Sequence, residues 1–178
     1  IKIFEELLPS YFFVENVPRF KKMLFPVDGE YIDLEELLIK KFGSSYNIKV
    51  EELNSADFSV PQSRARIAYR IWKKGLKWDI DNSKKIVTLE EAIGDLPSIE
   101  SGEDSGLKNH FTRLHPDNHI LAMKHTPTGK SAFDNLEYYP KKKNGEKIKG
   151  YNNTYKRMNW DRPAPTVTMR NEIISSQE

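Results

Sequence analysis

Apolar residues follow regular patterns in the first half of the chain. The run Tyr11-Phe12-Phe13-Val14 is apolar without interruption, which is typical of a strand buried on both faces. Residues 32–42 place leucines at helical spacing, with lysines opposite and Gly43 after them, which predicts an amphipathic helix. Residues 46–53 and 66–72 alternate apolar and polar positions, which predicts two further strands. Strands and a helix in succession indicate an α/β fold.

The character of the chain changes near residue 98. Thr88 followed three positions later by Glu91 predicts a capped helix start, and Gly94 ends that helix. Residues 99–106 are rich in Ser, Gly, Glu and Asp, as in a linker or exposed loop. We therefore expect two parts, residues 1–98 and residues 99–178.

The second part carries weaker patterns. Its clearest local signal is Asn144-Gly145, a preferred type I′ turn dipeptide between residues 137–139 and 147–149. This signal predicts a basic β-hairpin. We expect residues 99–178 to form a smaller, irregular and mainly β lobe.

The distribution of charged residues indicates which class of partner the chain can bind. The net charge of +2 is too small to identify a polyanion partner by itself. Residues 60–77 contain six basic side chains and no acidic one, and residues 138–157 contain seven, with Glu146 as the single acid and four tyrosines between them. Both stretches suit contact with phosphates, although either one alone also fits an ordinary solvated face.

The absence of cysteine excludes disulfides and thiolate metal sites in these 178 residues. His115 and His119 are four positions apart, but Pro116 interrupts the helix they would need, so we expect no metal site. The sequence has no run of about 18 apolar residues and no export leader. We expect a cytoplasmic protein with no membrane partner.

Candidate functional side chains cluster at two predicted strand ends. Glu15 follows the first apolar run, where open α/β sheets place their ligands, although it also fits a solvated loop. Arg64 and Arg66 open the strand of residues 66–72, and Gln62 lies in the loop before it, where its amide can brace its neighbours. The same pattern also fits two ordinary arginines on the protein surface.

Four sequence blocks in order resemble those of DNA cytosine-5 methyltransferases. They are Glu15-Asn16-Val17, Gln62-Ser63-Arg64-Ala65-Arg66, residues 89–97 (LEEAIGDLP) and residues 157–168 (RMNWDRPAPTVT). Each block alone is a weak motif, but together they cover nearly the whole chain. The resemblance implies the C-terminal part of a Rossmann-like methyltransferase sheet, within a partial catalytic domain (1–98), followed by a truncated target-recognition region (99–178).

The resemblance also implies roles for individual residues. In that family a cytosine is flipped out of duplex DNA, a cysteine adds to C6, and C5 takes a methyl group from S-adenosyl-L-methionine. Glu15 matches the glutamate on the N3 and N4 edge of the base, and Arg66 the arginine on O2. Asn16 and Gln62 would organise the pocket, while Arg64 and Thr166 would lie nearer the DNA backbone.

The lysines of the predicted hairpin are expected to contact the DNA backbone. They are Lys141, Lys142, Lys143, Lys147 and Lys149.

The chain also departs from the family pattern. It has neither a Pro-Cys nucleophile block nor a Phe-x-Gly-x-Gly cofactor loop, so we expect it to be a fragment that is inactive alone and works with the remaining parts of a methyltransferase. The parent would be an active enzyme, expected in a restriction-modification system. A non-catalytic DNA-binding homologue, or one subunit of a split methyltransferase, is the alternative.

Overall fold

The computed structural model describes residues 1–81, 85–142, 144–148 and 156–166. The chain divides into two compact units, residues 1–86 and residues 87–178, and each is described by itself. Within the described residues, no helix is long and apolar enough to cross a membrane.

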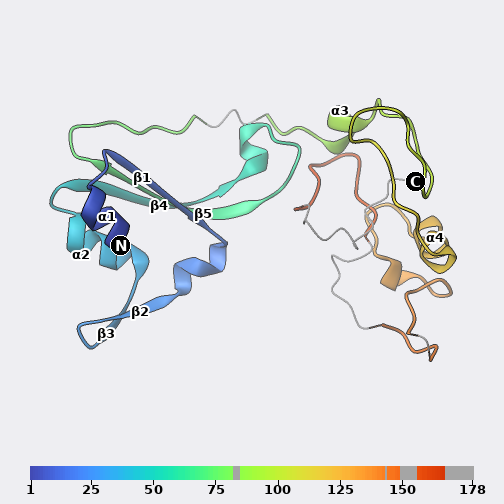
Figure 1. Ribbon diagram of the computed structural model, residues 1–178, viewed down its shortest axis with the longest axis horizontal. Coiled ribbons are helices and arrows are strands. Elements are labelled where there is room, and N and C mark those ends of the chain that lie inside the picture. Colours follow the sequence, from blue (N-terminus) through green and yellow to red (C-terminus); the bar gives the residue numbers. More distant parts are fainter. Residues whose placement is uncertain (82–84, 143, 149–155, 167–178) are drawn as a thin grey trace. The chain divides into compact units, whose positions relative to one another are not determined.

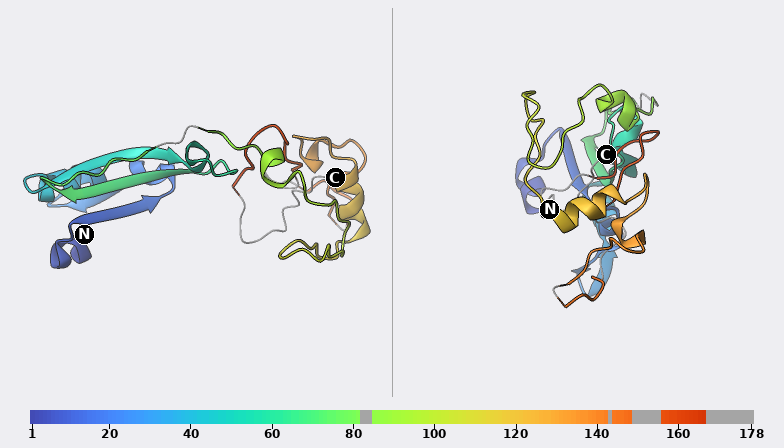
Figure 2. Two further views of the ribbon diagram at one scale, coloured as in Figure 1. Left: turned by 90° about the horizontal axis from the view of Figure 1, so that it is seen from above. Right: turned by 90° about the vertical axis from the view of Figure 1, so that its right-hand side faces the viewer.

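The first unit contains most of the regular structure (Figures 1 and 2). In chain order its elements are α1 (Lys2–Leu7), β1 (Tyr11–Asn16), the 3₁₀ helix η1 (Pro18–Lys22), β2 (Leu24–Val27), β3 (Glu30–Asp33), α2 (Leu34–Phe42), β4 (Tyr46–Asn54), the 3₁₀ helix η2 (Ser55–Phe58) and β5 (Ala65–Lys73). The strands β2 and β3 form a separate two-stranded sheet.

The main sheet has three strands in the order β1-β5-β4. β5 runs antiparallel to both neighbours, so β1 and β4 run parallel to each other on either side of it. Asn16, the last residue of β1, lies opposite Ile67 near the start of β5. This register brings the two predicted functional strand ends to the same end of the sheet.

One face of the main sheet carries the core. Ile67, Tyr69 and Ile71 of β5 are buried there, as their alternation predicted, and they pack with side chains of α1 and α2. The ring of Phe4 from α1 meets those of Phe42 and Tyr46 edge to face, with centroids 4.4 and 4.9 Å apart. Such contacts stabilise the fold beyond simple burial.

The opposite face of the main sheet differs from the sequence-based prediction for β1. Tyr11 and Phe13 are 48% and 51% exposed, so the apolar run of β1 is not buried on both faces in this chain. On this face the centroid of the Trp78 ring lies 5.6 Å from that of Tyr11 and 6.2 Å from that of Phe13, and the ring covers these two side chains only in part. β1 is also an edge strand, since among the described strands it pairs with β5 alone. The expectation that Glu15 ends a buried strand is therefore wrong, because every second residue of β1 is exposed.

The predicted helices form with the expected ends. Asp33 caps α2 by accepting a hydrogen bond from the Glu36 backbone amide, and Gly43 follows its last residue. Helix α3 (Leu89–Ile93) begins with the capping box of Thr88 and Glu91. Helix α2 starts two residues later than predicted because Ile32 belongs to β3.

The second unit consists of α3, α4 (Asp117–Lys124), the 3₁₀ helix η3 (Ala132–Asp134) and long loops. The expected mainly β character is wrong for the described part of this unit, which has isolated bridges but no strand. The predicted hairpin is reduced to one bridge between Lys141 and Lys147, with Gly145 at φ +85° in its turn. Lys143 and Lys149 lie outside the described residues.

Residues 156–162 connect the pieces of the second unit. The Arg157 guanidinium donates to the carbonyls of Thr126 (2.7 Å) and Met123 (2.6 Å), at the end of α4. The backbone amides of Leu89 and Glu90 at the start of α3 donate to carbonyls in the same segment. Residues 156–162 thereby supply hydrogen-bond partners for backbone groups at the end of α4 and at the start of α3, which lack partners within their own helices.

Candidate base-binding site

The first unit brings Glu15 and Arg66 into direct contact. Arg66 Nε lies 2.7 Å from Glu15 Oε1, and the two side chains are 21% and 46% exposed. Glu15 faces Ala68 across the strand pair, so Arg66 reaches it diagonally from two positions along β5. A second guanidinium nitrogen of Arg66 donates to the Ala65 carbonyl at 2.7 Å.

This pair presents both kinds of hydrogen-bonding group. Glu15 supplies an acceptor-only carboxylate, and a guanidinium has five N–H donors. The two contacts of Arg66 therefore still leave donors for a ligand. Both groups reach solvent. A planar ligand with a donor and an acceptor along one edge can therefore replace the hydrogen bond between Arg66 and Glu15 with one bond to each residue.

The loop before β5 is fixed by Asn54, at the end of β4. The Asn54 Oδ1 atom accepts from the backbone amides of Arg64 (2.9 Å) and Ala56 (3.2 Å), and its Nδ2 donates to Ser63 Oγ (3.1 Å). Ser55 continues this bracing, since its hydroxyl donates to the Gln62 carbonyl at 2.5 Å. The loop that carries Gln62 and Arg64 is thus fastened to the strand that flanks Arg66.

The remaining predicted site residues have varied surroundings. Asn16 Oδ1 accepts from the Val17 amide at 2.8 Å and shapes the exit from β1. Gln62 is held through its backbone, and Arg64 is half-buried. Thr166 is exposed in the second unit. The structure brings Glu15, Asn16, Arg64 and Arg66 to one end of the sheet.

The described lysines of the bridge make contacts within the second unit. Lys141 and Lys147 place their ammonium groups 4.8 and 4.9 Å from the ring centre of Tyr139, and Lys147 also donates to the Phe133 carbonyl. Lys142 pairs with Glu146 at 2.9 Å. All three side chains are exposed, so a phosphate can compete for them.

A second charged cluster was missed by sequence reasoning. Arg70 is only 2% exposed; it pairs with Glu51, donates to the Trp78 carbonyl at 2.7 Å and lies near the rings of Trp72 and Trp78. Burial raises the pKa of the Glu51 carboxyl, but hydrogen bonds and charges from Lys49 and Arg70 outweigh it, so the net pKa is lowered. This cluster fastens the chain after β5 to the outer face of the sheet.

The part of the chain that the structure describes has no group of three or more His, Asp or Glu side chains able to hold a metal ion. The missed residues Asn54 and Arg70 did leave weak signals. Asn54 precedes Ser-Ala-Asp, as helix-capping residues do, and Arg70 is a charge within an alternating strand.

Comparisons with known proteins agree on one family. The model of the family described as C-5 cytosine-specific DNA methylase matches residues 1–177. Type II methyltransferase M1.HgaI of Avibacterium volantium is 49% identical over 177 residues, which cover 99% of this chain and 50% of the relative. Type II methyltransferase M1.HphI of Haemophilus parahaemolyticus is 28% identical over 171 residues, covering 94% and 43%.

A solved structure supports the fold. Its description names a DNA modification methyltransferase encoded within an E. coli prophage; it aligns with a TM-score of 0.58 and 18% identity, covering 92% of this chain and 54% of that one. The chain spans about half the length of the curated relatives it matches.

Proposed function

This chain belongs to the C-5 cytosine-specific DNA methylase family, and from that premise we propose that it is the base-holding and DNA-contacting part of a Type II cytosine-5 methyltransferase in a restriction-modification system. Its substrate would be a cytosine flipped out of duplex DNA. The remaining parts of the enzyme would supply the attacking cysteine, because these 178 residues contain none.

The observation that carries this proposal is the contact between Glu15 and Arg66. The two residues come from separate family-like blocks, and they meet at 2.7 Å on a partly open surface. Cytosine has an N4 amino donor beside N3, and an O2 acceptor on the other side of N3. A carboxyl group and a guanidinium side by side match that edge.

In the proposed reaction Glu15 faces N3 and N4, while Arg66 donates to O2. Negative charge develops on the ring when C6 is attacked, and a proton shared between Glu15 and N3 stabilises it. Arg66 stabilises the same charge at O2. Asn16, Gln62 and Arg64 would hold the surrounding loops, with Arg64 and Thr166 beside the DNA backbone.

S-adenosyl-L-methionine supplies the methyl group in this family. The glycines of the first unit do not fit a cofactor loop: Gly29 lies in the β2–β3 turn, Gly43 ends α2, and Gly75 follows β5. A glycine-rich cradle after a strand would be needed for close backbone approach to such a cofactor. We therefore assign cofactor binding to the remaining parts of the enzyme.

The edge strand β1 supports a role for those parts. Its exposed Tyr11 and Phe13 form an apolar surface beside Glu15, which suits docking of the rest of a Rossmann-like catalytic domain. In this proposal residues 1–98 belong to the catalytic domain and residues 99–178 to the target-recognition region. The compact units divide earlier, at residue 86, so α3 lies in the second compact unit although the proposed boundary assigns it to the catalytic domain.

Two alternatives are also compatible with the absence of cysteine from these 178 residues: a subunit of a split methyltransferase, and a DNA-binding homologue without catalysis. Methylation by the complete parent protein separates these functions. Duplex DNA carrying tritium at cytosine C5 should release it to water as the methyl group arrives, and Glu15→Gln should suppress the release. Methyl transfer to DNA without tritium release would overturn the assignment to C5.

A further inference from the structure

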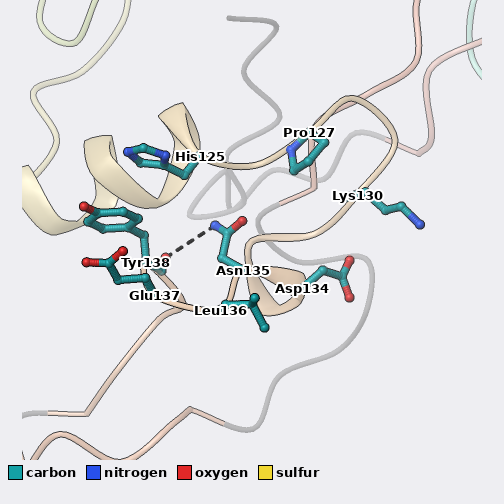
Figure 3. A pocket seen from close by; sticks show the side chains of 8 residues that line it. All are labelled: His125, Pro127, Lys130, Asp134, Asn135, Leu136, Glu137 and Tyr138. Atoms are coloured by element: carbon teal, nitrogen blue, oxygen red, sulfur yellow. Dashed lines mark hydrogen bonds between the residues drawn. The ribbon is translucent and has the colours of Figure 1, made fainter.

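The described part of the second unit contains a hollow of about 570 Å³ beside the end of α4 (Figure 3). The stacked rings of His125 and Tyr138, with centroids 4.1 Å apart, form part of its lining. The charged groups of the lining have mixed signs, since Asp134 and Glu137 lie there together with Lys130. Mixed charge selects no class of ligand, so the hollow adds nothing to the proposed function.

A cluster of charged side chains in the first unit borders the candidate base-binding site. Strand β5 lies between β1 and β4, and its residue Ala68 faces Glu15 of β1 on one side and Glu51 of β4 on the other. Arg66 and Arg70 lie two positions before and after Ala68, so their side chains leave the same face of the sheet. Two carboxylates and two guanidinium groups therefore surround one small residue.

The four charges form two ion pairs of different depth. Arg66 pairs with Glu15 at 2.7 Å, and both side chains are partly exposed. Arg70 pairs with Glu51 at 2.5 Å, and the Arg70 side chain is only 2% exposed. Although burial raises the pKa of Glu51, hydrogen bonds and charges from Lys49 and Arg70 lower this pKa on balance, so Glu51 is a carboxylate at neutral pH.

The register gives Arg66 two carboxylates to choose between. Diagonal neighbours on adjacent strands have Cα atoms about 7–8 Å apart, which a long side chain can span. Arg66 spans such a diagonal to reach Glu15, and Glu51 lies at the corresponding diagonal position on β4. Ala68, which lies between them, ends at its Cβ atom and offers no barrier. Glu51 would therefore be a second acceptor for Arg66 if Arg70 did not occupy it.

We propose that Arg70 is a positioning residue for the base-binding pair: it occupies Glu51 and so leaves Arg66 to Glu15 and to the O2 atom of the flipped cytosine. This inference rests on the proposed function, because it concerns the same site. It goes further by adding a buried residue that acts through Arg66 rather than by contacting the base.

The different depths of the two pairs explain the direction of this effect. An unpaired buried carboxylate is far more costly than a broken exposed ion pair. If Arg70 is removed, the free energy of the chain therefore favours moving Arg66 from the exposed Glu15 to the less exposed Glu51. Arg66 would then be withdrawn from the base.

Arg70→Met tests this role in the complete parent protein, with rates expressed per folded molecule. Its kcat should fall about tenfold or more, part of the loss expected when a positioned donor leaves the transition state. Adding Glu51→Gln removes the competing carboxylate, so the double variant should recover to within about threefold of the parent. Arg70→Gln keeps a donor for the Trp78 carbonyl and provides the same measurement if Arg70→Met does not fold.

Lys49→Ala is the matched control. It removes the other cation that pairs with Glu51, at 2.8 Å, but leaves Arg70 in place. Its kcat should therefore equal that of the parent. A kcat per folded molecule that Arg70→Met and Arg70→Gln leave unchanged, or a loss that Glu51→Gln does not restore, would overturn the inference.

NMR of the Arg66 Nε–H group follows the same choice without methylation. In the complete protein with isotope-labelled arginine, Arg66→Ala identifies the signal by its loss, and Glu15→Gln should shift it because Glu15 is the partner of that nitrogen. In the Arg70→Met protein the signal should respond to Glu51→Gln and no longer to Glu15→Gln. A signal that still depends on Glu15 in that protein contradicts the proposed role.

The two measurements separate this inference from the proposed function. If the parent protein does not methylate DNA while the Arg66 signal changes its partner as expected, the enzyme function falls and the control of Arg66 by Arg70 stands. If methylation proceeds and depends on Glu15, but neither kcat nor the Arg66 signal responds to Arg70, only the role of Arg70 falls.

Discussion

Arg66 of β5 and Glu15 of β1 form an ion pair at 2.7 Å on the open face of the sheet. Exposed ion pairs contribute about 0–1 kcal/mol to stability because water screens them and holding two side chains costs entropy. Glu15 is 46% exposed, so this pair belongs to that class. The pair therefore contributes little to stability, which leaves room for the proposed role in holding a base.

The first prediction separates these two roles. In the complete parent enzyme, Glu15→Gln and Arg66→Ala should each lower kcat by about 10²-fold or more, the scale for removing a positioned polar group from a transition state. Melting temperatures should change little. Single-turnover methylation and thermal unfolding, measured on the same preparations, check both parts.

Lys41→Ala supplies the control for this prediction. Lys41 forms a comparable exposed pair with Glu5, at 2.6 Å, on the helices of the other face. It should leave both the melting temperature and kcat nearly unchanged. If Arg66→Ala instead unfolded the protein while the remaining folded enzyme kept its rate, Arg66 would be a structural residue.

The second prediction concerns Asn54, which fastens the loop before β5. Asn54→Ala removes the acceptor for the Arg64 and Ala56 amides, worth about 1 kcal/mol each, so kcat/KM should fall by up to about 30-fold if the whole of that energy is lost from the geometry of the loop. Asn54→Asp keeps that acceptor and loses only the donor to Ser63, so it should stay within about twofold of the parent. Equal losses in both variants would contradict a role for the acceptor.

The third prediction concerns stability in acid. The pKa of Glu51 is lowered from 4.5 in the folded state, so its pairing with Arg70 stabilises the fold above the unfolded pKa. That contribution is lost as the pH falls through the folded pKa. Urea unfolding from neutral pH into acid should show a decline below about pH 4.5 that Glu51→Gln removes.

Truncating the cation tests the same cluster at neutral pH. Arg70→Ala leaves the Glu51 carboxylate without its buried partner, so stability should fall by about 3–5 kcal/mol. Lys49→Ala removes an exposed partner of the same carboxylate and should cost less than about 1 kcal/mol. Similar losses for the two variants would show that burial of Arg70 does not govern the cluster.

Periodicity predicted the elements of the first unit well because helices and strands leave local signatures. Ile67, Tyr69 and Ile71 lie on one face of β5 as their spacing required, and Thr88 and Glu91 cap α3. Strand direction has no such signature. The antiparallel pairing of β1 with β5 is set by long-range contacts. What covers each face of β1 is also non-local, so the apolar run at Tyr11 did not reveal that one face is half exposed.

The second unit was harder to predict because its order is largely non-local. The Leu89 amide bonds the Arg162 carbonyl, and the Arg157 side chain bonds the end of α4. No short pattern encodes such contacts. The Asn144-Gly145 dipeptide correctly marked a turn, but the residues before it formed a stacked and charged loop rather than a strand.

The fourth prediction is that this chain alone does not transfer methyl groups. It contains no cysteine to attack C6, and its described glycines in the first unit offer no cofactor cradle. Incubation with cytosine-containing duplex and labelled S-adenosyl-L-methionine should leave the DNA unlabelled. Labelling at or above one methyl group per protein molecule would contradict the need for other parts of the enzyme.

The last prediction separates positioning from readout in the second unit. Lysines mostly neutralise phosphates, and each engaged lysine adds about one unit to the dependence of log affinity on log salt concentration. Replacing Lys141, Lys142 and Lys143 by alanine should therefore weaken binding to cognate and random duplexes alike and lower that slope by about two to three units.

Sequence preference in methylation should survive the triple replacement. Glu146→Ala is the informative companion, because it frees Lys142 from its 2.9 Å pair and should strengthen binding slightly. Titrations over a series of salt concentrations give the slopes. An unchanged slope in the triple variant would place these lysines away from the DNA, while an altered preference would make them base readers, because phosphate contacts carry no direct sequence information.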